Sequence, residues 1–233
     1  EKEGRTQEEK HEESETQGRF KEMRTLLIGI GACVTVTLWT TTPVQTAASG
    51  VVTCESLVTL ALPHTTITSA TTVPAGAFTP PAGFRGRGGV NVFATVPSFC
   101  RVSATLAPST DSDIKVEVWL PTFAEGSGGQ ARGWNGKFQA VGNGGWAGTI
   151  SYPALAQAVT AGYATASTDT GHTGNNGQFA LGHPEKIIDF GYRAVHEMTV
   201  QAKAIVDAYY GAAPKVSFWN GCSLGGRQGI TEA

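Results

Sequence analysis

The sequence has few charged residues and no excess of positive charge. Only 15% of its 233 residues are charged, 17 of them basic and 19 acidic. Over residues 49–233 the two signs balance, with 11 basic and 11 acidic side chains. Nucleic-acid-binding domains instead gather lysine and arginine on one face to neutralise phosphates. We therefore expect no nucleic-acid partner for this part of the chain.

Long apolar runs are also missing, apart from one near the N-terminus. A basic start at residues 23–24 precedes the apolar stretch 25–39, and residues 46–48 are small enough for a cleavage site. The stretch is too short to span a membrane, and the pattern is typical of a secretory signal peptide. We therefore expect residues 23–48 to be removed and the protein to be secreted, extracellular or periplasmic, without a membrane anchor. Cys33, in Ile-Gly-Ala-Cys, leaves lipid modification open as an alternative.

The first 22 residues lack apolar side chains almost entirely. They carry 8 acidic and 5 basic residues, so they cannot bury enough surface to offset the entropy lost on ordering. We expect this segment to be disordered. It is either an interaction tail or the product of a start assigned upstream of the true one.

Cysteines number only four, and three of them follow the expected signal peptide: Cys54, Cys100 and Cys222. Export permits disulfide bonds. Cys54 and Cys100 can pair, which leaves Cys222 alone. An odd cysteine in an exported protein calls for a partner, and the sequence offers none.

Residues 49–233 are expected to form one α/β domain. Hydrophobic periodicity and turn residues predict strands at 99–106, 114–120, 137–141, 163–168 and 215–219. They also predict helices at 153–161 and 190–209 and a further helix from Gly225. Asp189 is the expected N-cap of the helix at 190–209. Residues 54–100 indicate short strands and loops. The alternation of strands and helices after residue 137 favours a sheet with right-handed crossovers.

A nucleophile elbow is predicted at residues 221–225. They read Gly-Cys-Ser-Leu-Gly, the G-x-S-x-G pattern in which a sharp strand-to-helix turn exposes a serine. Ser223 would be the nucleophile, and the N–H of Leu224 would stabilise the oxyanion. The alternative is an inert serine in a tight turn.

A second oxyanion donor is expected from the glycine-rich loop after the strand at 137–141. Glycines allow backbone N–H groups to approach a ligand closely. Either Gly144 or Gly145 fits this role, and the sequence does not separate them.

The base that would activate Ser223 is missing from the sequence after it. No histidine and no aspartate follow Ser223, although α/β-hydrolases place the acid and then the histidine downstream. The upstream candidates are His64, His172, His183 and His196, with Asp111, Asp113, Asp169, Asp189 and Asp207. We interpret His172 as a loop or lining residue, His196 as a surface residue and Asp169 as a brace for its loop. We expect the base, its acid and the partner of Cys222 to lie beyond Ala233.

The stretch NGCSLGGRQG resembles the G-C-S-x-G-G-R-x-G elbow of the tannase and feruloyl esterase family. Supporting stretches are WNGKFQAVGNGGWAGTI (134–150), GYATASTDTGHTG (162–174) and DFGYRAVHEMTVQAKAIVDAYYG (189–211). The resemblance runs from about Cys54 to the end. It implies the N-terminal part of an α/β-hydrolase sheet, with the lid domain and the C-terminal catalytic portion missing.

The resemblance also implies a serine carboxylesterase. Its substrates would be esters of aromatic acids, such as feruloyl or galloyl esters, as small molecules or linked to a polymer. Ser223 would form the acyl-enzyme, and Cys222 would bond a cysteine next to the catalytic histidine. Cys54 with Cys100 would match the N-terminal disulfide of the family. A structural calcium belongs to the family's lid, so this chain is expected to hold no metal or cofactor and to be inactive alone.

A different class of function stays open from the sequence. A hydrolase-like module without catalysis could bind plant polysaccharide or aromatic ligands. Trp134 and Trp146 flank the predicted oxyanion loop and would form its binding platform.

Overall fold

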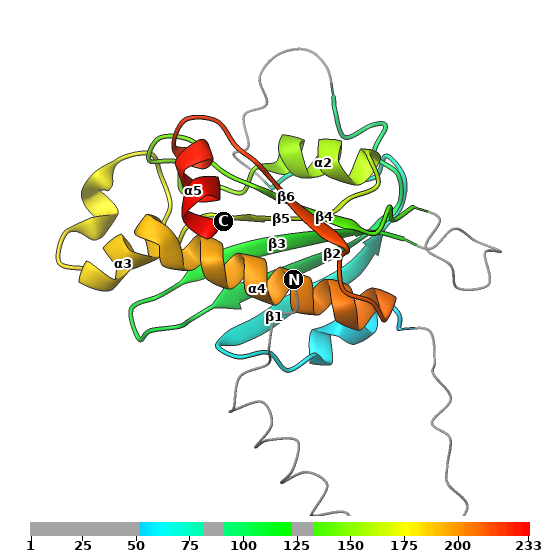
Figure 1. The fold of residues 1–233 in the computed structure, drawn as a ribbon, viewed down its shortest axis with the longest axis horizontal. Helices are drawn as coiled ribbons and strands as arrows, with labels where there is room; N and C mark the ends of the chain where they lie inside the picture. Colours follow the sequence, from blue (N-terminus) through cyan, green and yellow to red (C-terminus); the bar gives the residue numbers. More distant parts are fainter. Residues whose placement is uncertain (1–51, 82–90, 123–132) are drawn as a thin grey trace, which may run out of the picture. The chain divides into compact units, whose positions relative to one another are not determined.

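The computed structural model describes residues 52–81, 91–122 and 133–233. One compact unit spans Ser49–Ala233, and its described residues are shown in Figure 1. The predictions for residues 1–22 and 23–48 lie outside the described residues, as does Cys33.

A six-stranded mixed sheet forms the centre of this unit, with strand order β1-β2-β3-β5-β4-β6. The strands are β1 (Thr65–Val73), β2 (Phe99–Leu106), β3 (Ile114–Pro121), β4 (Lys137–Val141), β5 (Ala164–Thr168) and β6 (Val216–Asn220). Strands β1, β2, β3 and β5 pair antiparallel in turn. Strand β4 pairs parallel with both β5 and β6. The five strands expected between residues 99 and 219 are confirmed, and β1 is the strand within the stretch expected to hold short strands and loops.

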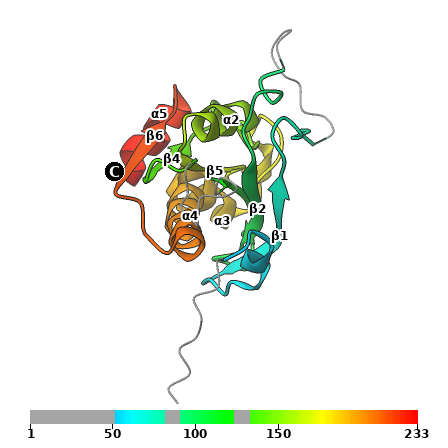
Figure 2. The ribbon, with the colours of Figure 1, turned by 90° about the vertical axis from the view of Figure 1, so that its right-hand side faces the viewer.

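Helices cover both faces of the sheet. The helical segments are η2 (Glu55–Thr59), α2 (Tyr152–Thr160), η3 (Gly177–Ala180), α3 (Pro184–Ile188), η4 (Asp189–Arg193), α4 (Ala194–Tyr210) and α5 (Leu224–Glu232). Figure 2 shows α2 on one side of β4 and β5 and α4 on the other. Met198 and Ile205 of α4 join one buried cluster, and Leu155 of α2 joins the second. Because both faces are covered, β3 is buried at seven of its eight positions, more than its alternating sequence indicates.

The predicted N-cap of the long helix is wrong. Asp189 has helical dihedrals (φ −55°, ψ −53°) and lies in a π-turn that joins α3 to α4, so the helical stretch begins at Pro184. The Asp189 side chain is fully buried and accepts a hydrogen bond from Nε of Arg193 at 2.6 Å. A buried ion pair, rather than a cap, therefore explains this aspartate. The predicted end is confirmed, because Gly211 adopts the left-handed conformation (φ 68°).

A disulfide joins Cys54 and Cys100, as the sequence allowed. The two Cα atoms lie 5.5 Å apart and both cysteines are buried. The bond ties the start of η2 to β2, at the antiparallel end of the sheet. Within the described part of the chain, Cys222 is the free cysteine, and it is exposed.

Candidate active site

Ser223 lies in a strained turn between β6 and α5. Its dihedrals are φ 56° and ψ −121°, a conformation that residues other than glycine rarely adopt. Such strain costs about 1–3 kcal/mol and gathers at functional sites. Ser223 is exposed, and its hydroxyl makes no capping hydrogen bond with the helix it precedes. The turn therefore presents an uncommitted hydroxyl at the N-terminus of α5, as an elbow requires.

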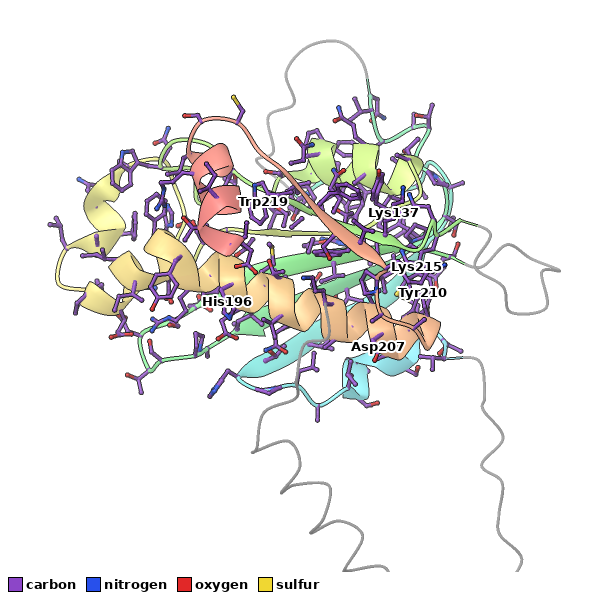
Figure 3. The ribbon with its side chains drawn as sticks, in the orientation of Figure 1. Lys137, His196, Asp207, Tyr210, Lys215 and Trp219 are labelled. Atoms are coloured by element: carbon purple, nitrogen blue, oxygen red, sulfur yellow. A yellow bond between two sulfur atoms is a disulfide. The ribbon has the colours of Figure 1, made fainter. Side chains whose placement is uncertain are left out.

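The glycines on either side of Ser223 are needed for the turn to close. A Cβ on Gly221 would lie 2.4 Å from the carbonyl oxygen of Gly225, and one on Gly225 would lie 2.5 Å from that of Asn143. Trp219 packs against the same helix and donates its Nε1–H to the Gly225 oxygen at 2.7 Å, and Figure 3 shows it beside α5. The positions that flank Ser223 must therefore be small, and Gly221 and Gly225 meet that need.

The glycine-rich loop that follows β4 lies against the elbow. The Gly142 N–H donates to the Asn220 carbonyl at 2.9 Å, and the Asn143 N–H donates to Oε1 of Gln228 at 3.2 Å. The N–H groups of Gly144 and Gly145 donate to no acceptor among the described residues. Parallel pairing places the ends of β4 and β6 at the same edge of the sheet. The structure therefore brings the predicted loop and the predicted nucleophile together.

No histidine of the described segments hydrogen bonds to Ser223. His172 is buried, and its Nε2 lies 2.9 Å from the Trp146 carbonyl oxygen, which fixes Nε2 as the donor. Nδ1 of His183 lies 3.0 Å from Asp111. The other two are His64, exposed before β1, and His196, on the exposed side of α4, 3.4 Å from Glu232. The interpretation of His172 as a loop or lining residue is confirmed. That of His196 as a surface residue is confirmed too, and Figure 3 shows His196 on α4.

Asp169 braces the loop after β5, as its sequence position indicates. Its Oδ1 accepts hydrogen bonds from the N–H groups of Lys115 and Gly171, both at 2.9 Å. Burial raises the pKa of this carboxyl to about 6, although the two N–H donors oppose the shift. Asp169 is therefore committed to the backbone of its own loop and of β3.

A polar cavity of about 590 Å³ opens beside this brace. Its lining includes Asp113, Lys115, Asp169, His172, Gln178 and Lys186. In the described segments no three His, Cys, Asp or Glu side chains lie close enough to hold a metal ion. In the same segments no helix is long and apolar enough to cross a membrane.

The two tryptophans expected beside the loop lie in different places. Trp146 is half exposed and stacks on Phe190 at 5.0 Å, next to the loop. Trp134 instead stacks on Tyr210 at 4.0 Å, and Figure 3 shows Tyr210 at the opposite end of β6 from the elbow. The expectation that Trp134 flanks the loop is wrong. The whole length of β4 separates Trp134 from the loop.

Sequence reasoning missed Asn143 and Gln228. Both are buried and hydrogen bond to each other across 85 residues. A polar residue inside a glycine-rich loop was the only local signal for Asn143. Gln228 offered none, because a glutamine in a helix is ordinarily exposed.

Comparisons with known proteins agree with this geometry. The family model described as "Tannase and feruloyl esterase" matches residues 100–233. An uncharacterized esterase of Xanthomonas campestris is 44% identical over 190 residues, which cover 81% of this chain and 30% of that protein. A probable feruloyl esterase B-1 of Aspergillus fumigatus is 40% identical over 131 residues, which cover 56% of this chain and 23% of that protein.

Solved structures show the same fold. Feruloyl esterase B from Aspergillus oryzae superposes with a TM-score of 0.64 at 34% identity, over 76% of this chain and 32% of that one. Tannin acyl hydrolase from Aspergillus niger gives a TM-score of 0.53 at 25% identity, over 73% and 31%. The chain spans about a third of the length of these relatives, and its sheet is that of an α/β-hydrolase. With the family match over residues 100–233 and the strained serine turn at its sheet edge, the chain belongs to the tannase and feruloyl esterase family.

Proposed function

We propose that the enzyme hydrolyses carboxylic esters of aromatic acids, feruloyl or galloyl esters, through an acyl-enzyme on Ser223. The observation that carries the proposal is the strained conformation of Ser223 at the N-terminus of α5, with its hydroxyl exposed. A strain of this size persists only where the surrounding structure imposes it. The esterases among the relatives support the class of reaction.

The proposed reaction begins with attack by Oγ of Ser223 on the ester carbonyl carbon. The negative charge that develops on the carbonyl oxygen would be held by the N–H of Leu224 and by that of Gly144 or Gly145. The choice of these two glycines is supported by the bonds of the two preceding N–H groups, which donate to Asn220 and to Gln228. The N-terminus of α5 adds a favourable dipole. Loss of the alcohol leaves the acyl-enzyme, which water then hydrolyses.

The base that takes the serine proton is proposed to come from outside these 233 residues. The support is twofold: no histidine of the described segments hydrogen bonds to Ser223, and the chain spans about a third of the length of its relatives. Cys222 is exposed beside Ser223, where a disulfide to a cysteine next to that histidine would hold base and nucleophile together. The chain alone would then be inactive or nearly so.

Export is part of the proposal. The Cys54–Cys100 disulfide supports an oxidising compartment, in line with the signal peptide expected at residues 23–48. The substrate would then be met outside the cell, free or attached to a polymer.

The test is hydrolysis of methyl ferulate and of a galloyl ester by the full-length enzyme. We expect Ser223→Ala to abolish hydrolysis of both while the circular dichroism spectrum and melting temperature stay close to those of the wild type. Mass spectrometry after reaction with a fluorophosphonate should find the label on Ser223. Retention of hydrolysis in Ser223→Ala would reject the proposal.

The rival function, a binding module without catalysis, is favoured by one observation, the half-exposed stack of Trp146 on Phe190. It requires polysaccharide or aromatic-ligand binding that Ser223→Ala leaves unchanged, together with no ester hydrolysis by the wild-type enzyme.

A further inference from the structure

We propose that Asn143 and Gln228 act as positioning residues that hold the nucleophile elbow and the oxyanion loop in register. The inference rests on the proposed function of Ser223. Gln228 projects from α5, five residues after the nucleophile, and is 2% exposed. Its Nε2 donates to Oδ1 of Asn143 at 2.7 Å, and its Oε1 accepts the Asn143 N–H at 3.2 Å. We call this pair of hydrogen bonds the amide clamp.

Asn143 makes further hydrogen bonds beyond the amide clamp. Nδ2 of Asn143 donates to the Thr168 carbonyl at 3.1 Å, and at 3.5 Å it faces that of Thr149. One side chain thus joins α5, the end of β5 and the segment before α2. Asn143 is itself 8% exposed. Both side chains are buried and bonded to protein groups, so both act through the backbone they hold.

The contact that the amide clamp controls is a close approach of two backbones. A Cβ on Gly142 would lie 2.8 Å from Cα of Gly225, and one on Gly225 would lie 2.5 Å from the Asn143 oxygen. Contacts between glycines set a distance but give little resistance to sliding, because they are not directional. Two hydrogen bonds to one amide are directional. The amide clamp therefore sets where the loop stands along α5.

This register decides which N–H groups can face the reacting oxygen. The clamp occupies the N–H of Asn143, and Asn220 accepts that of Gly142. The next two N–H groups along the loop belong to Gly144 and Gly145. A small slide of the loop would move them off the oxyanion, and misplacement by about 1 Å can cost about 100-fold in rate.

The test is Gln228→Met in the full-length enzyme, which keeps the volume and removes both hydrogen bonds. We expect kcat on methyl ferulate to fall about 10- to 100-fold, with KM changed less than about 3-fold. The matched control is Gln201→Met. Gln201 is also a buried helical glutamine, 4% exposed, but its side chain bonds Glu197 within α4. It should lower the melting temperature to a similar extent without lowering kcat.

A second variant separates the two hydrogen bonds. Gln228→Glu keeps an acceptor for the Asn143 N–H but places a second acceptor against Oδ1, so it should also lower kcat. It also replaces Gln228→Met should that variant be insoluble. A double variant combines Gln228→Met with Asn143→Ala. Its fold-loss of kcat should be far smaller than the product of the fold-losses of the two single variants.

The outcomes are distinct. Equal kcat values for the wild type, Gln228→Met and Gln228→Glu would overturn the inference and leave the proposed function intact. So would an equal loss of kcat in Gln201→Met. If the wild-type enzyme neither hydrolyses aromatic esters nor reacts with a fluorophosphonate at Ser223, the proposed function fails and the inference falls with it.

Discussion

The two halves of the sheet are held together in different ways. The antiparallel half, strands β1, β2 and β3, contains the disulfide, and β2 alternates buried and half-buried residues along its length. The parallel half, strands β5, β4 and β6, contains the candidate site. In it, four of the five residues of β6 are exposed. A covalent bond thus reinforces one half, while backbone pairing with β4 and the contacts of α5 position the exposed edge strand of the other.

The difference teaches that strain and stability are separated in this fold. The strained backbone of Ser223 lies in the parallel half, after the exposed edge strand β6, where close glycine contacts and the amide clamp hold it. The disulfide and the buried carboxylate of Glu117 lie in the other half. We therefore expect substitutions in the parallel half to change catalysis most and substitutions in the antiparallel half to change stability most.

The largest effect is expected from Gly225→Ala in the full-length enzyme. The added Cβ would meet the Asn143 oxygen at 2.5 Å and push the oxyanion loop away from the elbow. We expect kcat to fall about 100- to 1,000-fold, the range for loss of an oxyanion donor. The control is Gly226→Ala, whose Cβ would meet its nearest atom at 3.6 Å and should leave kcat nearly unchanged. Similar kcat values for the two variants would contradict the close-contact argument.

Removing the disulfide should have the next largest effect, on stability alone. The double substitution Cys54→Ala with Cys100→Ala opens a loop of 46 residues, and its loss should lower the free energy of unfolding by about 4 kcal/mol. Urea denaturation followed by circular dichroism measures the change. Because the bond lies in the antiparallel half, kcat at 25 °C should stay close to that of the wild type for the folded fraction. A kcat lowered as much as in Gly225→Ala would break the comparison.

Glu117 provides a further test of the antiparallel half. Its buried carboxylate in β3 accepts hydrogen bonds from Arg101 and from Nε1 of Trp119, both at 2.8 Å, and from the Tyr152 hydroxyl at 3.3 Å. Burial, reinforced by the Glu117 charge, raises the pKa of Tyr152 to about 12. Glu117→Leu would leave the Arg101 guanidinium without its partner and should cost about 3 kcal/mol of unfolding free energy.

The control for this prediction is Glu117→Gln, which keeps the shape and part of the hydrogen bonding and should cost less. Thermal and urea unfolding of both variants measure the difference. If Glu117→Leu proved as stable as the wild type, the cluster would not be a main source of stability in this half.

Asp169 links the two halves, and its ionisation should make the stability of the protein depend on pH. Its folded pKa of about 6 lies above the ordinary value of 3.8, so between about pH 4 and pH 6 the folded state binds more protons than the unfolded state. The contribution of this group to stability is therefore favourable at low pH and is lost as pH rises through 6. At 1.36 kcal/mol per unit the total is about 2–3 kcal/mol.

Asp169→Asn keeps an acceptor for the two N–H donors and does not titrate. The difference in unfolding free energy between variant and wild type should move in favour of the variant by about 2–3 kcal/mol from pH 4 to pH 7. Urea denaturation at several pH values measures it. A difference that does not change with pH would show that the carboxyl titrates near its ordinary value.

Much of the fold could be predicted because its elements have local signals. The apolar period of α4, the left-handed turn at Gly211 and the short strands bounded by glycine each depend on nearby residues. The exception was the π-turn at residues 189–193. An aspartate before an apolar helical pattern has the sequence signal of an N-cap, and only the buried partner Arg193 makes it part of the helix instead.

The candidate site could be predicted only in part. Ser223 and its two glycines follow from the steric needs of a sharp turn, and the loop containing Gly144 and Gly145 follows from its composition. Trp134 was misplaced because it precedes β4 whereas the loop follows β4, so the two lie at opposite ends of that strand although they are close in sequence. Gln228 was missed because the partner that buries it is 85 residues away.

The sequence by itself determined the elbow, the alternation of strands and helices, and the resemblance to an esterase family. These depend on interactions within a few residues: hydrophobic periodicity, the space available to a side chain in a turn, and a motif of ten residues. Only the tertiary structure decided that β4 lies between β5 and β6, that the glycine-rich loop therefore meets the elbow, and that two amides hold them together. Those outcomes require contacts between distant segments, whose geometry no local pattern contains.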